Sequence, residues 1–251
     1  MFQTNAFRLF LFGLIVAVVS CSSSKQNHSV YHKKPKKIIL LIGDGMGVAQ
    51  ISTLFLEKDN TNNFKRFKHI GFINTRSGSH KITDSAAGAT AFACGEKTYN
   101  NSVGMNMDSV AIDNLIEVCS AMKYTTGVVS TSSITHATPA SFFAHTKHRK
   151  FEFDIAKQLL KSDIDFFAGG GNDFFKDMRS DMKLYDWTID TSSYQDWKSL
   201  VFDSNKKYGY LLAGQGLPTM EAGRGDFLPE ASLAALNYLG KRKSFLMIEG
   251  S

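Results

Sequence analysis

Apolar runs alternate with amphipathic segments along this chain, and the alternation predicts its secondary structure. Continuous apolar runs rich in β-branched residues are typical of strands buried on both faces of a parallel sheet. The predicted strands are 37–42, 125–130, 165–168, 209–212 and 244–248, with a shorter one at 70–74. The predicted helices are 48–58, 112–122, 153–161, 195–204 and 229–239, with further helices that start at or next to Ser85 and at Pro139. Residues 172–194 are polar and have no assignment. This order predicts an α/β fold, a doubly wound, mostly parallel sheet with helices on both faces.

Polar residues follow several of these strands directly. Asp44 comes after the first strand, residues 131–138 after the second, and Glu249 after the last. In doubly wound sheets, ligands bind beyond the carboxyl ends of the strands. We therefore expect these side chains to meet at one edge of the sheet.

The segment 82–91, Ile-Thr-Asp-Ser-Ala-Ala-Gly-Ala-Thr-Ala, combines a carboxylate, a hydroxyl and a run of small residues. Asp84 is a good N-cap residue and the alanines favour a helix, so Ser85 is placed at a helix start. Free N–H groups and the helix dipole attract anions there. The alternative is an ordinary capped helix in the core.

Two further residues suit a hard cation. Asp44, between two glycines, can ligate a metal or can cap the next helix. Thr138 offers a neutral oxygen suited to Mg²⁺, with His136 as a ligand or as support for one. Alternatively, Thr138 is the N-cap of a helix with Pro139 in its first position.

Two more candidates complete the set. The guanidinium of Arg149 matches phosphate oxygens in a bidentate fork, although it is also one basic residue in a basic stretch. Glu249 ends an apolar strand, where a carboxylate is either a metal ligand or merely an exposed strand end.

The N-terminus has the features of an export signal. Arg8 precedes a short apolar region, 9–19, which is too short for an ordinary transmembrane helix. Cys21 follows, as in bacterial lipoprotein signals, where the cysteine is lipidated; a plain secretory signal is the alternative. We expect a signal peptide at 1–20, a linker at 21–35 and one catalytic domain at 36–251. The domain is then exported to the periplasm, the outer membrane or the cell surface, on a lipid anchor.

Composition adds two points. The 251 residues are 43% hydrophobic with a net charge of +6, and much of the excess charge lies in lysines near the N-terminus. A solvated tether explains that charge, and no nucleic-acid binding is expected, because no recognition motif accompanies it. Cys94 and Cys119 fit no zinc motif. They are either core residues, which we favour, or a disulfide of an exported protein.

The motifs at 43–47, 82–100 and 246–250 together resemble the alkaline phosphatase family, over about residues 36–251. The resemblance implies hydrolysis of phosphate monoesters at alkaline pH by an enzyme with two zinc ions and one magnesium ion. Ser85 corresponds to the nucleophile and a zinc ligand. Asp44 corresponds to the residue that bridges that zinc and magnesium. A homodimer is compatible with the resemblance.

The remaining site residues also have counterparts in that family. Thr138 and Glu249 correspond to magnesium ligands. Arg149 corresponds to the phosphate-binding residue, which Asp84 orients. Some members have aspartate at the position of His136, so the resemblance leaves open whether His136 ligates magnesium or supports a ligand.

One departure concerns zinc. In the family, an Asp and several His after the Glu-Gly strand end complete both zinc sites, whereas all seven histidines here precede residue 149. The expectation is an N-terminal part of a longer enzyme, inactive alone, with its zinc ligands largely beyond Ser251. The alternatives are a phosphodiesterase or sulfatase, although the sulfatase motif Cys/Ser-x-Pro-x-Arg is absent, and a non-catalytic phosphate-binding surface lipoprotein.

Overall fold

The computed structural model describes residues 35–57, 62–192 and 196–251. The predicted signal peptide, Cys21 and all of the linker except Pro35 lie outside the described residues. Within them, no helix is long and apolar enough to cross a bilayer.

A six-stranded sheet forms the centre of the domain, and all of its neighbouring strands are parallel. The strand order is β1-β6-β2-β3-β5-β4. The strands are β1 (Lys37–Gly43), β2 (Thr125–Ser133), β3 (Phe166–Gly170), β4 (Trp187–Asp190), β5 (Lys207–Leu211) and β6 (Ser244–Gly250). The last strand in sequence pairs with the first two long ones, as a doubly wound sheet requires. The predicted fold class is therefore confirmed.

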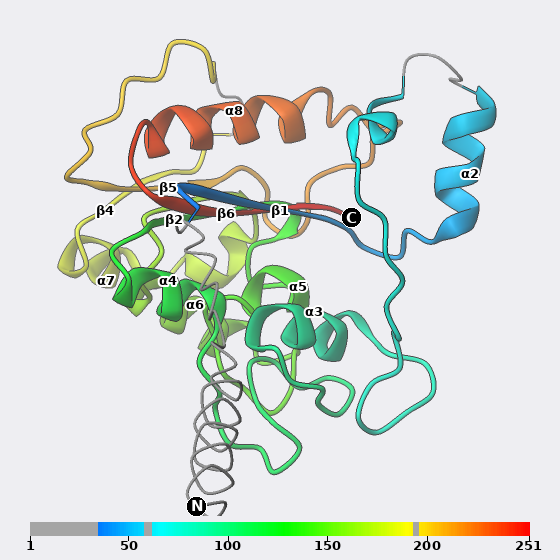
Figure 1. Cartoon of the computed structure of the whole chain (residues 1–251). Helices are drawn as coiled ribbons and strands as arrows, with labels where there is room; N and C mark the ends of the chain where they lie inside the picture. The colour runs from blue at the N-terminus through cyan, green and yellow to red at the C-terminus, as the bar shows by residue number, and fades with distance from the viewer. Residues whose placement is uncertain (1–34, 58–61, 193–195) are drawn as a thin grey trace, which may run out of the picture. The chain divides into compact units, whose positions relative to one another are not determined.

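Helices cover both faces of the sheet (Figure 1). The helices are α2 (Val48–Glu57), α3 (Ser85–Cys94), α4 (Leu115–Ala121), α5 (Ala137–Ala140), α6 (Glu152–Lys161), α7 (Arg179–Leu184) and α8 (Phe227–Leu239), with 3₁₀ turns η1 (Asn63–Arg66) and η2 (Asn172–Phe175). Successive strand residues point to opposite faces. Phe166 accordingly packs in the apolar cluster with α8, and Phe167 in the cluster with α4 and α6.

Several predicted elements were wrong or displaced. Residues 70–74 form no strand, because the described part of the chain supplies them no partner strand, and Ile70 and Phe72 are almost fully exposed. Residues 196–204 are irregular, with a turn at 197–199, rather than helical, and Trp197 packs against Tyr210 and Phe227. The unassigned stretch 172–194 contains η2, α7 and β4.

Helix α4 begins three residues later than predicted. Asn114 is its N-cap, and its side chain accepts hydrogen bonds from the backbone N–H groups of Ile116 and Glu117. The Glu117 side chain in turn accepts from the Asn114 N–H, which completes a capping box. Local capping chemistry thus overrides the apolar spacing that extended the prediction back to Ile112.

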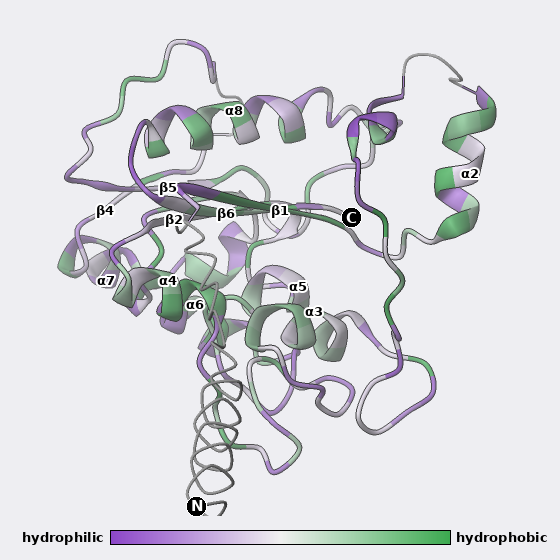
Figure 2. Ribbon diagram, in the orientation of Figure 1, coloured by the Kyte–Doolittle hydropathy of each residue, from purple (hydrophilic) through white to green (hydrophobic). Residues whose placement is uncertain are grey.

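The β1 edge of the sheet is apolar and exposed. Among the described strands, β1 has a neighbour on one side only, and its Ile39 and Leu41 side chains are 47% and 61% exposed. Helix α2 has no buried residue and projects away from the sheet, and Figure 2 shows hydrophobic positions along it. We call β1, α2 and the exposed segment 67–73 together the apolar edge.

Candidate functional site

Ser85 is the first residue of α3, and Asp84 caps this helix. The Asp84 Oδ1 atom accepts a hydrogen bond from the Ala87 N–H at 3.0 Å, and Oδ2 accepts from the Asn101 N–H at 3.1 Å. The alanines that follow are mostly buried, which fixes the helix against the domain. The hydroxyl of Ser85 is therefore held where the helix has free N–H groups.

Asp44 lies in the turn after β1. Its backbone N–H donates to the Gly250 carbonyl at 3.0 Å, which ties the ends of β1 and β6 together. Gly45 adopts a positive φ of 69°, the left-handed conformation that glycine accepts without strain. The Ser85 hydroxyl donates to Asp44 Oδ2 at 2.9 Å. The fold thus joins a hydroxyl and a carboxylate that lie 41 residues apart.

Arg149 reaches the same region from the loop before α6. Its Nη1 atom lies 3.3 Å from Asp84 Oδ2, and its Nη2 atom lies 2.7 Å from His136 Nε2. Because a guanidinium only donates, Nε2 of His136 accepts and its proton resides on Nδ1. Burial lowers the pKa of His136, and the Arg149 charge lowers it further. The guanidinium is therefore held between a carboxylate and a neutral imidazole.

Glu249 is fully buried at the end of β6. Its Oε2 atom accepts from the Ser130 hydroxyl and, at 3.2 Å, from the Ser132 hydroxyl. Its Oε1 atom is buried and has no hydrogen-bond partner. Burial raises the pKa of Glu249, and hydroxyls of Ser130 and Thr138 oppose that rise. A buried carboxylate with one open oxygen is typical of a cation ligand, because buried charges are paired or coordinate metals.

Thr138 is buried within the short helix α5. His136 is the N-cap, without a side-chain capping bond, and Thr138 is already the second helical residue. The alternative prediction that Thr138 is the N-cap is therefore wrong, and the Thr138 hydroxyl is available to the site.

Two cavities are lined by six of the seven candidate residues. A cavity of about 890 Å³ is lined by Asp44, Asp84, Ser85, Thr138 and Arg149. His136 lines a smaller cavity of about 300 Å³ beside it, and Glu249 is not among the residues that line either cavity. The structure thus brings five of the seven candidates of the predicted site to one cavity and leaves the other two at its border.

The donor atoms of the candidate site fit magnesium better than zinc. Asp44, Thr138, Glu249 and Ser85 offer oxygen atoms, which suit Mg²⁺. The open Oε1 of Glu249 is the observation that favours a cation at this place. Zinc sites need about three protein ligands, usually including nitrogen or thiolate. Among the residues that the structure describes, no group of three or more His, Cys, Asp or Glu could hold a metal ion.

Both described cysteines are free. Cys119 is buried in the core, and Cys94 is half-buried, where burial raises the pKa of its thiol to about 12. This structure therefore contains no disulfide between Cys94 and Cys119.

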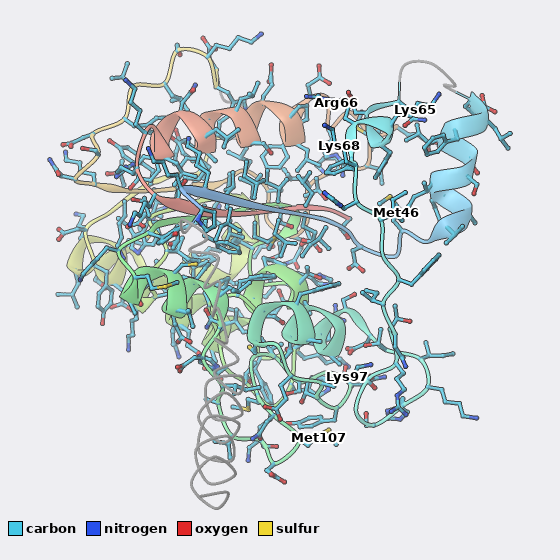
Figure 3. The ribbon with its side chains drawn as sticks, in the orientation of Figure 1. Met46, Lys65, Arg66, Lys68, Lys97 and Met107 are labelled. Atoms are coloured by element: carbon cyan, nitrogen blue, oxygen red, sulfur yellow. The ribbon has the colours of Figure 1, made fainter. Side chains whose placement is uncertain are left out.

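The sequence reasoning missed three residues at the site. Ser130 and Ser132 contact Glu249, and the signal for them is a pair of hydroxyls two positions apart, on one face of a buried strand. Lys97 lines the larger cavity, and its Nζ donates to the carbonyls of Asn74 and Arg76 at 2.7 and 2.6 Å (Figure 3). It fixes the segment 74–76 as one wall of that cavity.

Comparisons with known proteins agree on one family. The family model described as alkaline phosphatase matches residues 35–217. Alkaline phosphatase 3 of Bacillus subtilis is 34% identical over 236 residues, which cover 86% of this chain and 51% of that protein. The chain spans about half the length, or less, of the curated relatives it matches.

Solved structures give the same result. The alkaline phosphatase from the Antarctic bacterium TAB5 superposes with a TM-score of 0.82 at 48% identity, covering 87% of this chain and 66% of that one. A mutant of that enzyme, solved with Mg bound in its M3 site, superposes with a TM-score of 0.81 at 47% identity, covering 86% of this chain and 64% of the mutant.

Proposed function

The chain belongs to the alkaline phosphatase family, and from that premise we propose that it is part of an enzyme that hydrolyses phosphate monoesters through a phosphoserine at Ser85. One observation carries the proposal. The Ser85 hydroxyl, at the start of α3, contacts Asp44 in a cavity that Arg149 and Thr138 also line. A nucleophile, an anion-binding helix start and a guanidinium thus face one space.

The residues divide the reaction between them. Arg149 binds two phosphate oxygens in its fork and keeps the phosphorus in line with Ser85. The Ser85 oxygen attacks phosphorus, the bond to the alcohol oxygen breaks, and the alcohol leaves with a proton. Water then attacks the phosphoserine and releases inorganic phosphate. Bound cations would supply charge neutralisation and a lowered pKa for the serine hydroxyl.

We propose that Asp44, Thr138 and Glu249 hold one magnesium ion. Their oxygen donors and the open Oε1 of Glu249 support this, as does magnesium in the TAB5 mutant structure. We further propose two zinc ions, with Asp44 and Ser85 ligating one of them and the remaining donors lying outside the residues that the structure describes. We also propose that the protein is exported on a lipid anchor at Cys21 and assembles as a homodimer.

Trapping the covalent intermediate tests the function. The full natural polypeptide is mixed with labelled phosphate at low pH, digested, and the labelled peptide is sequenced. We expect label on Ser85, and we expect Ser85→Ala to lose both the label and several orders of magnitude in turnover. Ser52→Ala, an exposed serine of α2, is the matched control. Label on any other residue would overturn the assignment.

The alternative of a non-catalytic phosphate-binding protein is favoured by one observation, the lack of a zinc donor cluster among the described residues. Zinc content and turnover of the full natural polypeptide, compared with those of purified residues 22–251, separate the two. We expect residues 22–251 to bind less than one zinc per chain and to leave aryl phosphates intact at alkaline pH with added zinc and magnesium, and the full polypeptide to gain both zinc and turnover, which a phosphate-binding protein would not. Stoichiometric zinc with ordinary turnover in residues 22–251 would show that side chains outside the proposed site serve as zinc ligands.

A further inference from the structure

Ser130 and Glu249 are direct register partners on the neighbouring parallel strands β2 and β6. Register partners project to the same face of a sheet, so the hydroxyl and the carboxylate lie side by side. Ser132, two positions further along β2, projects to that face as well. Both hydroxyls reach the same carboxylate oxygen, Oε2.

Hydrogen bonding directs the proton of Ser130. The Ser130 oxygen already accepts from the Ser132 backbone N–H at 3.0 Å and lies 2.8 Å from the Ser132 hydroxyl. Its own proton is donated to Glu249 Oε2. The local turn of β2 thus orients one hydroxyl toward one carboxylate oxygen.

The consequence for Glu249 is an asymmetry between its two oxygens. Oε2 accepts from two hydroxyls, whereas Oε1 is buried and has no hydrogen-bond partner. A carboxylate held by one oxygen can rotate little, so the other oxygen keeps a fixed direction. Asp44, another of the proposed magnesium donors, is tied to the end of the same strand, because its backbone N–H donates to the Gly250 carbonyl at 3.0 Å.

We propose that Ser130, assisted by Ser132, is a positioning residue that holds Glu249 so that Oε1 alone faces a divalent cation. The inference rests on the proposed magnesium site. Residues that orient a metal ligand typically contribute 10- to 100-fold to metal affinity. Ser130 donates its only proton there, whereas the Ser132 hydroxyl also has the Ser133 carbonyl as an acceptor at 3.1 Å, so the contribution of Ser130 is the larger of the two.

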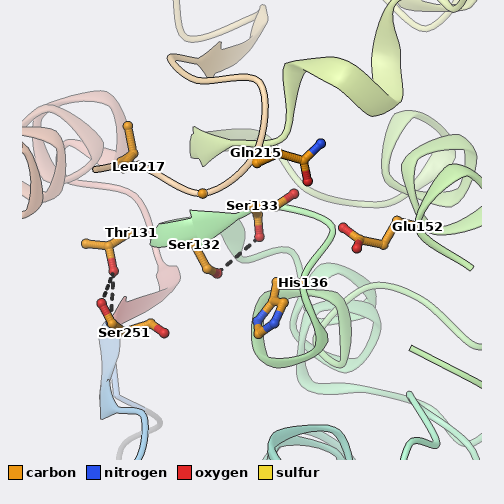
Figure 4. A pocket seen from close by; sticks show the side chains of 9 residues that line it. Thr131, Ser132, Ser133, His136, Glu152, Gln215, Leu217 and Ser251 are labelled. Atoms are coloured by element: carbon orange, nitrogen blue, oxygen red, sulfur yellow. Dashed lines mark hydrogen bonds between the residues drawn. The ribbon is translucent and has the colours of Figure 1, made fainter. Parts of the chain in front are cut away.

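Neighbouring Ser133 provides a matched control. It is buried on the same strand, but its hydroxyl contacts Thr135 at 2.6 Å rather than Glu249. Figure 4 shows Ser132 and Ser133 on β2 in the smaller cavity, together with His136 and Glu152. Removal of the Ser133 hydroxyl therefore takes a buried polar group from β2 without releasing the carboxylate.

The test measures the affinity of the metal-depleted full polypeptide for Mg²⁺ by isothermal titration, with thermal unfolding in chelator alongside. We expect Ser130→Ala to weaken Mg²⁺ binding about 10- to 100-fold. We expect Ser132→Ala to weaken it less, Ser133→Ala to leave it unchanged, and Ser130→Thr, which restores a hydroxyl, to recover most of it. A merely structural role would lower the melting temperature of Ser130→Ala in chelator without changing the affinity.

Glu249→Gln separates this proposal from the function on which it rests. If Glu249→Gln abolishes Mg²⁺ binding and Ser130→Ala does not change it, the positioning role is wrong and the magnesium site stands. If Glu249→Gln also leaves Mg²⁺ binding unchanged, both the site and the positioning role are overturned. Equal losses in Ser130→Ala and Ser133→Ala would likewise refute a role specific to Glu249.

Discussion

The Ser85 hydroxyl lies 2.9 Å from Asp44 Oδ2 and donates to it. Asp44 is fixed by its own backbone bond to Gly250 at the end of β6, and Ser85 by the capped start of α3. Two independent elements, a strand end and a helix start, therefore place the two side chains next to each other. In the proposed enzyme, this carboxylate faces both the nucleophile and the cation.

Replacement of that carboxylate tests its charge separately from its shape. Asp44→Asn keeps an oxygen that can accept from Ser85 but loses the negative charge that a divalent cation requires. We expect the Mg²⁺ affinity and the turnover of the full polypeptide to fall by more than about 100-fold. Loss of a residue that only orients a metal ligand costs at most about that much, and Asp44 is proposed as a ligand itself. Isothermal titration and a phosphatase assay measure the two. Asp108→Asn, an exposed aspartate, is the control, and unchanged Mg²⁺ binding in Asp44→Asn would contradict the assignment.

Arg149 is expected to bind phosphate both in the substrate and as free inorganic phosphate. Arg149→Ala removes a charge-assisted pair, worth about 1.5–3 kcal/mol. The expected result is a loss of roughly one to two decades in kcat/KM and a similar weakening of inhibition by inorganic phosphate. Steady-state kinetics with phosphate as inhibitor measures both quantities.

Two further variants test whether the effect of Arg149→Ala depends on the guanidinium of Arg149 itself. Arg149→Lys keeps the charge but not the planar fork, so it should recover only part of the phosphate affinity. Lys150→Ala removes the exposed neighbouring charge and should change inhibition little, because exposed charges are screened. If Arg149→Ala leaves phosphate inhibition intact, the guanidinium binds no phosphate oxygen.

The sequence predicted where the candidate residues lie better than it predicted which side chains hold them in place. Asp44 and Ser85 were predictable because each follows local rules, a turn after a buried strand and a capped helix start. The contact between Ser130 and Glu249 depends on the register of β2 against β6, which no local pattern in either strand specifies. The helix predicted at 195–204 is likewise not formed over 196–204, where Trp197 packs against residues of β5 and α8 that no local pattern identifies as its partners.

Reactivity of Cys94 tests the buried-thiol assignment. Its pKa, raised from 9.0 to about 12 by burial and then by nearby carboxylates, leaves about a thousandth of the thiolate found in an unfolded chain. We expect native protein at pH 8 to react with iodoacetamide far more slowly at Cys94 than protein unfolded in denaturant. Peptide mass spectrometry after timed labelling gives the rates. A disulfide would instead block labelling in denaturant until a reductant is added.

Asp165 makes stability depend on pH. Burial raises the pKa of its carboxyl above the usual 3.8, although the Thr126 N–H bond at 2.8 Å opposes the rise. The folded state therefore favours the protonated form, and the contribution of Asp165 to stability is lost as pH rises through the folded pKa. Asp165→Asn, which retains an acceptor for Thr126, should gain in melting temperature relative to the parent as pH rises from about 3.8 toward neutrality.

Thermal unfolding of both proteins between pH 3 and pH 7 gives this comparison. Asp177→Asn, at an exposed position, is the control. If Asp165→Asn instead falls behind the parent as pH rises, attraction of the ionised carboxylate to Lys207 and Arg242 outweighs the cost of its burial.

The apolar edge predicts self-association of the isolated chain. Ile70 and Phe72 are 91% and 95% exposed, and each would gain about 1.5–3 kcal/mol on burial. Exposed apolar groups beside an unpaired strand edge favour association. We expect purified residues 35–251 to bind a hydrophobic dye and to sediment as larger species, and Ile70→Ser with Phe72→Ser to reduce both effects without lowering the melting temperature. Val201→Ser removes an equally exposed apolar residue outside that edge and should change neither. If it matches the double variant, general surface hydrophobicity and not this edge drives association.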